Sequence, residues 1–110
     1  ATQGSRSNGR LNDGEAVCLG NSGPMWFSLA DVQSQSGIAI TTANGSGDIS
    51  LSYAESSWPN GNNELAESNN SGNDECIYIA NSSQYWGYLK VSGSSNGVSL
   101  VVDYNSSGCR

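Results

Sequence analysis

The chain has 110 residues, about one domain's worth, and its ten acidic residues outnumber four basic ones to give a net charge of −6. Histidine is absent, which excludes Ser–His and Cys–His nucleophiles and histidine-based metal sites. The scattered basic residues could not neutralise a phosphate backbone, and the apolar runs are too short to span a bilayer, so neither nucleic acid nor a membrane is an expected partner.

The first ten residues, Ala1 to Arg10, are predicted to be a linker or a frayed terminus, because Ala1 is their only aliphatic residue. A single domain is then expected over residues 11–110. Short strand-like runs bounded by Gly, Pro, Asn or Ser follow one another along this domain. The runs cover residues 16–19, 25–32, 37–42, 48–53, 76–80, 85–92 and 98–104.

Several of these runs alternate apolar and polar residues, and Ile38 and Ile40, for example, would share one face. No stretch keeps a helical period, and only Glu64–Ser68 could form a helical turn. Asn96–Gly97 lies between two runs and predicts a hairpin. The pattern therefore predicts an all-β fold, an antiparallel, jelly-roll-like β-sandwich of seven to eight short strands.

Small polar residues dominate the composition, with 21 serines, 13 asparagines and 14 glycines. This composition is similar to that of secreted bacterial β-proteins, and the three cysteines are compatible with an oxidising compartment. We therefore expect a secreted, extracellular protein that is a mature fragment of a longer precursor.

The aromatic run at residues 85–92 is the most informative, because side chains alternate faces along a strand. We expect Trp86, Tyr88 and Lys90 on the outer face, where two rings beside a cation would form a binding surface. The residues expected to point inward are Tyr85, Gly87, Leu89 and Val91. The alternative is the opposite parity, which would place the two outer rings in the core.

Trp58 is the only aromatic residue in the long polar stretch at residues 54–75, and long loops inside compact domains are often functional. Its ring would either extend the binding surface or anchor the loop over one end of the sandwich, and the second interpretation is favoured. Trp26 and Phe27 lie in an earlier run, and both are expected in the core.

Two pairs of carboxylates, Asp13 with Glu15 and Asp74 with Glu75, have the chemistry of a glycosidase or a Ca²⁺ site. No ligand-dense acidic run accompanies them, so we predict no bound metal and no other cofactor. Asp48 follows a glycine-rich turn and is expected to cap it. A catalytic Ser–Lys pair would need a serine that stands out from the rest, and none does, so the chain is predicted not to be an enzyme.

The order of motifs along the chain is distinctive. Gly-Ser-Gly-Asp at 45–48 precedes Gly-Asn-Asp-Glu at 72–75, the aromatic strand follows, and Gly-Val-Ser-Leu at 97–100 closes the series. This order resembles the bacterial pre-peptidase C-terminal domain, a β-sandwich appended to secreted proteases, notably metalloproteases and collagenases of marine Gammaproteobacteria. The resemblance covers about residues 11–104.

The cysteines depart from the pattern of that family. The family often joins the cysteine after Gly-Asn-x-Glu to an earlier one, at a position that Ala66 occupies here, and its usual Arg-Pro-Tyr is replaced by Glu67-Ser68-Asn69. Because first and last strands often neighbour each other in such sandwiches, we expect a Cys18–Cys109 disulfide, with Cys76 left as a thiol.

The resemblance implies a non-catalytic C-terminal module, covalently attached to the catalytic domain of a secreted bacterial protease. It would bind fibrous or insoluble protein such as collagen, and we expect Trp86, Tyr88, Lys90 and Trp58 to carry that binding. Two other functions stay open: a secretion or maturation segment removed by proteolysis, and a carbohydrate-binding module whose rings stack on sugars.

Overall fold

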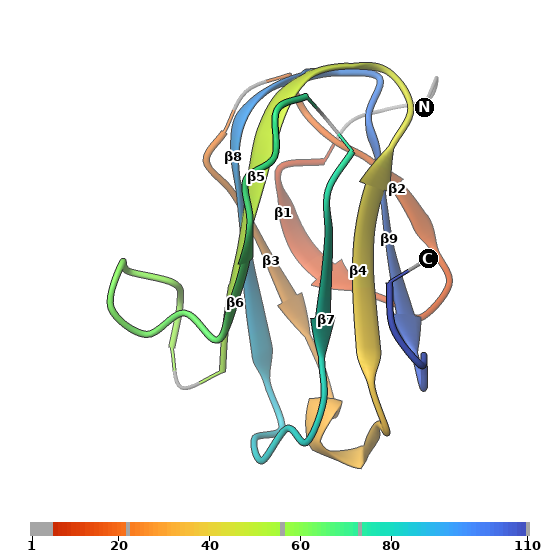
Figure 1. The fold of residues 1–110 in the computed structure, drawn as a ribbon, viewed down its shortest axis with the longest axis vertical. Coiled ribbons are helices and arrows are strands. Elements are labelled where there is room, and N and C mark those ends of the chain that lie inside the picture. Colours follow the sequence, from red (N-terminus) through yellow and green to blue (C-terminus); the bar gives the residue numbers. More distant parts are fainter. Residues whose placement is uncertain (1–5, 22, 56, 73, 110) are drawn as a thin grey trace.

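The structure is a computed structural model that describes residues 6–109 apart from 22, 56 and 73. These residues form nine strands and one short 3-10 turn, η1, at Val32–Ser34 (Figure 1). The strands are β1 (Asn8–Leu11), β2 (Ala16–Cys18), β3 (Met25–Leu29), β4 (Ile38–Ala43), β5 (Ser46–Ala54), β6 (Ala66–Ser68), β7 (Cys76–Ile79), β8 (Gly87–Asn96) and β9 (Ser99–Tyr104).

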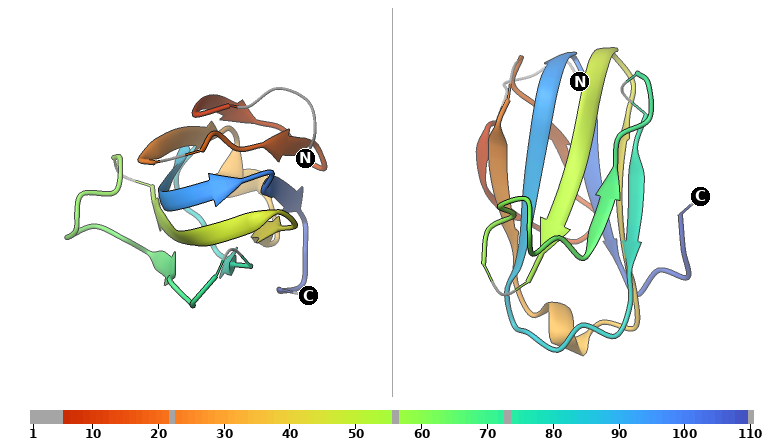
Figure 2. Two further views of the ribbon diagram at one scale, coloured as in Figure 1. Left: turned by 90° about the horizontal axis from the view of Figure 1, so that it is seen from above. Right: turned by 60° about the vertical axis from the view of Figure 1, so that its left-hand side comes forward.

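The strands form two sheets that pack face to face as the layers of a sandwich (Figure 2). One sheet has the order β1-β3-β8-β5-β6 and the other the order β2-β9-β4-β7. Neighbouring strands are antiparallel, except that β1 runs parallel to β3. The predicted all-β antiparallel sandwich is confirmed, with β1 and β6 added to the seven runs that the sequence pattern marked.

The core lies between the two sheets and is built from alternate residues of each strand. Met25, Phe27 and Leu29 of β3 are fully buried, whereas Trp26 and Ser28 lie half-buried on the opposite face. The same alternation buries a second set of side chains on β4, β5, β8 and β9: Ile38, Ile40, Ile49, Leu51, Tyr53, Leu89, Val91, Leu100 and Val102. A period-two pattern gives each sheet one apolar face, and stacking those faces removes them from water.

The prediction that residues 1–10 form a linker is wrong for Asn8–Arg10. These residues belong to β1, which pairs with β3, and the backbone N–H of Trp26 donates to the carbonyl of Ser7 at 3.0 Å. The pattern missed β1 because an edge strand needs backbone partners more than apolar side chains, and only Leu11 of β1 is buried. Residues 1–5 lie outside the described part of the chain.

Two local predictions about turns are also wrong. Residues 66–68 of the expected helical turn form β6 instead, antiparallel to β5, and the short helix lies at Val32–Ser34. Asn96–Gly97 does not form a hairpin, because β8 and β9 belong to different sheets and the turn crosses between them. Gly97 takes a left-handed conformation with φ of 72°, which suits this sharp reversal. The described chain contains no helix long and apolar enough to cross a membrane.

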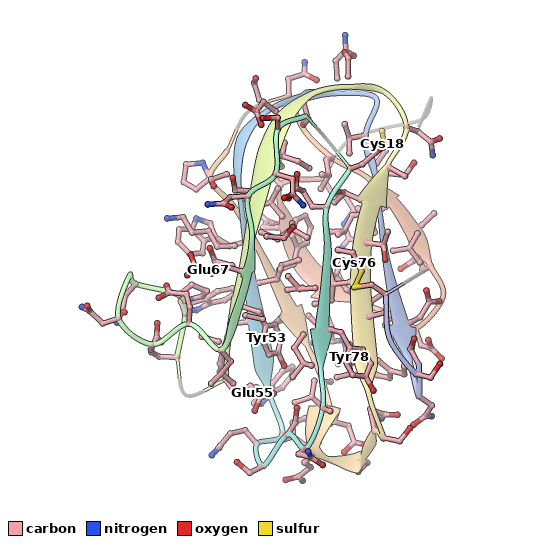
Figure 3. The ribbon with its side chains drawn as sticks, in the orientation of Figure 1. Cys18, Tyr53, Glu55, Glu67, Cys76 and Tyr78 are labelled. Atoms are coloured by element: carbon pink, nitrogen blue, oxygen red, sulfur yellow. A yellow bond between two sulfur atoms is a disulfide. The ribbon has the colours of Figure 1, made fainter. Side chains whose placement is uncertain are left out.

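The predicted Cys18–Cys109 disulfide is wrong, because the structure joins Cys76 to Cys109 and leaves Cys18 as a half-buried thiol. The assumption that β2 and β9 are neighbours was correct, but Cys18 lies opposite Ser99 at the start of β9, whereas Cys109 follows the end of that strand. After β9 the chain turns past Gly37 and reaches β7, where Figure 3 places Cys76 well away from Cys18.

Candidate binding face

The outer face of the five-stranded sheet carries aromatic side chains on two neighbouring strands. β3 and β8 are antiparallel partners, with Trp26 opposite Lys90 and Ser28 opposite Tyr88. Gly87, Leu89 and Val91 are buried, as predicted, and the residues between them point outward. Because the register aligns the outward residues of both strands, Trp26, Tyr88 and Lys90 share one surface.

Trp58 completes this surface from the loop between β5 and β6. Its ring centroid lies 5.7 Å from that of Trp26, in an edge-to-face arrangement at 85°, and 4.7 Å from that of Tyr88. The ammonium of Lys90 lies 5.4 Å from the centre of the Trp26 ring, within reach of a cation–π interaction. We call Trp26, Trp58 and Tyr88, with Lys90 at their edge, the aromatic cluster.

The aromatic cluster is open to solvent. Trp58 is 41% exposed, and a shallow hollow lies between its ring and that of Trp26. Of the two interpretations of Trp58, the structure supports the one in which its ring extends the aromatic surface. Rings that pack against one another and still reach solvent keep a fixed shape, so they offer a partner contact area at a small cost in conformational entropy.

Hydrogen bonds within the β5–β6 loop hold Trp58 in place, although Figures 1 and 2 show the loop projecting from the sandwich. The side-chain amide of Asn63 donates to the hydroxyl of Ser57 at 3.0 Å and to the carbonyl of Trp58 at 3.1 Å. The backbone N–H of Gly61 donates to Glu64 at 2.7 Å, which lowers the pKa of that carboxyl. The loop therefore has a defined shape that presents Trp58 to the sheet.

Trp86 and Tyr85 form a second aromatic pair before β8 begins. Their ring centroids are 5.1 Å apart in an edge-to-face arrangement, and the two side chains are 40% and 47% exposed. Trp86 is exposed, as predicted, but the prediction that Tyr85 points inward is wrong. The alternation applies only within a strand, and β8 starts at Gly87.

Trp26 is the member of the cluster that the sequence prediction missed. We expected both Trp26 and Phe27 in the core, and only Phe27 is there, fully buried. Strict alternation along Met25, Trp26 and Phe27 was the signal that could have found it, because consecutive strand residues cannot share one face.

Three of the four paired carboxylates singled out by the sequence accept hydrogen bonds within the fold. Asp13 accepts a hydrogen bond from the backbone N–H of Tyr104 at 2.8 Å, and Glu15 accepts one from Asn12 at 3.2 Å. Glu75 is buried and accepts from the Ser68 hydroxyl at 2.6 Å. Across the described residues, no three potential metal-ligating Asp, Glu, Cys or His side chains come together.

Asp48 was expected to cap its own turn. Instead its carboxylate accepts a hydrogen bond at 3.2 Å from the backbone N–H of Gly72, which lies in the connection between β6 and β7. Asp48 therefore joins two segments that are distant in the sequence.

Comparisons with known proteins place this geometry in context. No protein-family model matches the chain. Over all 110 residues it is 46% identical to a microbial collagenase of Vibrio alginolyticus, and it spans 14% of that protein's length. The pre-peptidase C-terminal domain of a collagenase from Bacillus anthracis has the same fold, with a TM-score of 0.64 and 18% identity over 93% of this chain and 100% of that one. The chain has the fold of a collagenase pre-peptidase C-terminal domain.

The resemblance recognised in the sequence is thus confirmed. The pre-peptidase C-terminal fold is also close to that of two proteins with other roles. CBM_E1, a carbohydrate-binding module solved with cellopentaose, has a TM-score of 0.55 and 20% identity over 94% of this chain and 99% of its own. PliG, a periplasmic lysozyme inhibitor from Aeromonas hydrophila, has a TM-score of 0.58 and 15% identity over 91% and 97%. At such identities these likenesses concern the fold alone.

Proposed function

We propose that this chain is a non-catalytic accessory module of a secreted, collagenase-type protease, and that the aromatic cluster binds insoluble protein such as collagen. Similarity along the whole chain to part of a collagenase supports the role of an accessory module. In the proposal, a catalytic domain is attached to the module in the parent protein.

The observation that carries the binding role is the aromatic cluster itself. Three rings from two strands and a structured loop lie side by side, with a cation at their edge and solvent above them. Aromatic residues at the centre of an interface commonly supply most of its binding energy. A weak contact of this kind would suffice, because tethering a catalytic domain near its substrate raises the effective concentration of both.

The module would act through adhesion and not through chemistry. The Asp13, Glu15 and Glu75 carboxylates hold backbone and side-chain donors of the fold. The chain contains no histidine that could serve as a general base near neutral pH. We accordingly expect no hydrolysis of gelatin or casein by the isolated domain.

A carbohydrate-binding module is the second candidate, favoured by the exposed rings of the cluster and by the fold shared with a cellopentaose-binding module. Retention on insoluble collagen, cellulose and chitin separates the two functions. Retention on cellulose or chitin and not on collagen would favour the carbohydrate-binding module. Retention on none of the three materials would favour a maturation segment.

Substitutions locate the surface in the same assay. Trp58→Ala should weaken retention on collagen roughly thirtyfold, because loss of a central aromatic anchor costs at least about 2 kcal/mol of binding. Its melting temperature should change little, since the ring lies on the surface. Trp86→Ala tests whether the second aromatic pair belongs to the site. Val101→Ala, on the outer side of the four-stranded sheet, is the control and should bind like the wild type.

If neither Trp26→Ala nor Trp58→Ala weakens retention on collagen, the proposed site is contradicted. Normal retention by Trp86→Ala alone would confine the site to the aromatic cluster.

A further inference from the structure

A separate groove lies where the β5–β6 loop meets the segment after β7. Two adjoining hollows share Glu55, Leu65 and Ser83 in their lining. In Figure 3, Glu55 lies in the lower part of the sandwich, with Tyr78 on the neighbouring β7. We call this feature the Glu55 groove, and the residues that define it are Glu55, Leu65, Tyr78, Ile79, Ser82 and Ser83.

Glu55 is an unusual residue to find in the wall of such a groove, because its side chain is only 7% exposed. Its Oε2 atom accepts hydrogen bonds from the Tyr53 hydroxyl at 2.9 Å and from the Ser82 hydroxyl. Burial, reinforced by the neighbouring Glu55 carboxylate, raises the pKa of Tyr53 far above its usual range. Tyr53 therefore stays protonated and keeps donating, which fixes the carboxylate in one orientation.

The other oxygen of Glu55, Oε1, receives no hydrogen bond from the described residues. Among the described residues, the side-chain oxygen that is fully buried and has no hydrogen-bond partner is Oε2 of Glu75. Oε1 of Glu55 is not such an atom. Oε1 of Glu55 therefore keeps some exposed surface, in a residue that lines the groove. A carboxylate oxygen held in place with its lone pairs unused is a ready acceptor for a cationic donor.

The geometry around Glu55 Oε1 favours a lysine over an arginine side chain. Oε2 already accepts two hydrogen bonds, so the carboxylate cannot present both oxygens to the planar fork of an arginine. A primary ammonium needs only one acceptor point. Some of the walls beside it are apolar, since Leu65 is 61% exposed and Tyr78 and Ile79 line the same hollow. Such walls suit the four-carbon stem of a lysine.

We propose that the Glu55 groove binds a lysine side chain of a partner peptide or protein, with the ammonium on Glu55 Oε1 and the stem against Leu65. The net charge of −6 favours the approach of a cationic ligand. This site goes beyond the proposed function: it uses a different surface, and it does not require that the aromatic cluster bind collagen.

Titration of the ¹⁵N-labelled domain with the peptide Ac-Gly-Lys-Gly-NH₂, followed by NMR, tests the proposal without any fibre. The lysine peptide should shift the amide signals of Leu65 and of residues 79–83. The matched peptide with norleucine keeps the stem but lacks the ammonium, and it should bind about tenfold more weakly, the cost of one charged hydrogen bond. The arginine peptide should also bind more weakly than the lysine peptide.

Glu55→Gln is the decisive variant. It keeps an oxygen to accept from Tyr53 and Ser82 but removes the charge, so the preference for lysine over norleucine should disappear. Glu67→Gln is the matched control, since this exposed carboxylate on β6 lines neither hollow, and it should bind like the wild type. Leu65→Ala should weaken binding of both peptides, and because the side chain is exposed the fold should be retained.

Equal binding of the lysine and norleucine peptides would overturn the proposal, as would unchanged lysine binding by Glu55→Gln. Equal binding of the lysine and arginine peptides would overturn the single-oxygen argument. If Glu55→Gln fails to fold, the wild type still decides: lysine binding that does not weaken as salt is raised would rule out the ion pair.

Discussion

The two outer faces of the sandwich differ sharply, although the same alternation of side chains creates both. The face of the five-stranded sheet carries Trp26, Tyr88 and Lys90 and is joined by Trp58. The face of the four-stranded sheet carries the exposed Tyr78 on its edge strand β7 and, around a shallow hollow, small or short side chains. Its lining residues are Thr41, Ala43, Asn44, Ser99, Val101 and Asp103.

The segment of chain after β9 covers part of one face. It passes over the four-stranded sheet, where the Tyr78 hydroxyl donates to the carbonyl of Ser106 at 3.1 Å and Cys109 bonds to Cys76. The β5–β6 loop instead places the ring of Trp58 against the outer face of the five-stranded sheet. Each sheet thus has one outward face, and the two faces differ in the size and charge of their side chains.

The largest expected contrast is in stability, between variants of two neighbouring residues on opposite faces of β3. Phe27→Ala should lower the free energy of unfolding by about 3–5 kcal/mol, because it empties a fully buried site. Trp26→Ala, one residue earlier on the outer face, should lose much less stability and should instead lose collagen retention. Urea denaturation of both variants measures the difference, and similar losses of stability would show that Trp26 is a core residue.

The disulfide gives the next largest contrast. Cys76→Ser should cost about 3–4 kcal/mol of stability, because Cys76 and Cys109 are 33 residues apart and their bond restricts the unfolded chain. Cys18→Ser should change stability little, since Cys18 is unpaired. Denaturation under non-reducing conditions compares the two variants. A larger loss for Cys18→Ser, or a peptide map that joins Cys18 to Cys109, would contradict the observed pairing.

Gly87→Ala should have an intermediate effect. Gly87 is buried beneath the face that carries Tyr88, and a Cβ atom there would meet the Tyr53 hydroxyl and lie 2.9 Å from a Tyr53 ring carbon. Such overpacking should cost about 1–3 kcal/mol of stability. Ser28→Ala, on the outer side of the adjacent β3, is the control. Thermal unfolding measures both, and equal stability of Gly87→Ala and the wild type would mean that the Tyr53 ring has room to move.

The smallest expected effect concerns the cation at the edge of the aromatic cluster. Lys90→Met keeps the aliphatic stem but removes the ammonium at the edge of the cluster, so the free energy of collagen binding should weaken by only about 0.5–1 kcal/mol, the scale of one exposed charge contact. Lys90→Arg should preserve it. A loss as large as that of Trp58→Ala would make Lys90 a principal contact and not an edge of the surface.

Much of the fold could be predicted from the sequence, because alternation is a local property. The Cβ atoms of successive strand residues point to opposite faces whatever the strand pairs with, so the seven runs and the buried positions of β8 were predictable. The outward positions of Tyr88 and Lys90 followed from the same rule. The same rule also held for Trp26, which the sequence prediction wrongly assigned to the core.

Only the tertiary structure decided which distant segments meet. Asn96–Gly97 has the sequence of a hairpin, but it connects different sheets, because the pairing partners of β8 and β9 come from elsewhere in the chain. The Cys76–Cys109 bond depends on where the chain goes after β9. The contact of Trp58 with Tyr88 and the position of Glu55 beside Ser82 depend on how two loops fold back. Local periodicity in the sequence carries no information about such long-range contacts. Both candidate sites therefore depend on the tertiary packing of segments that are distant in the sequence.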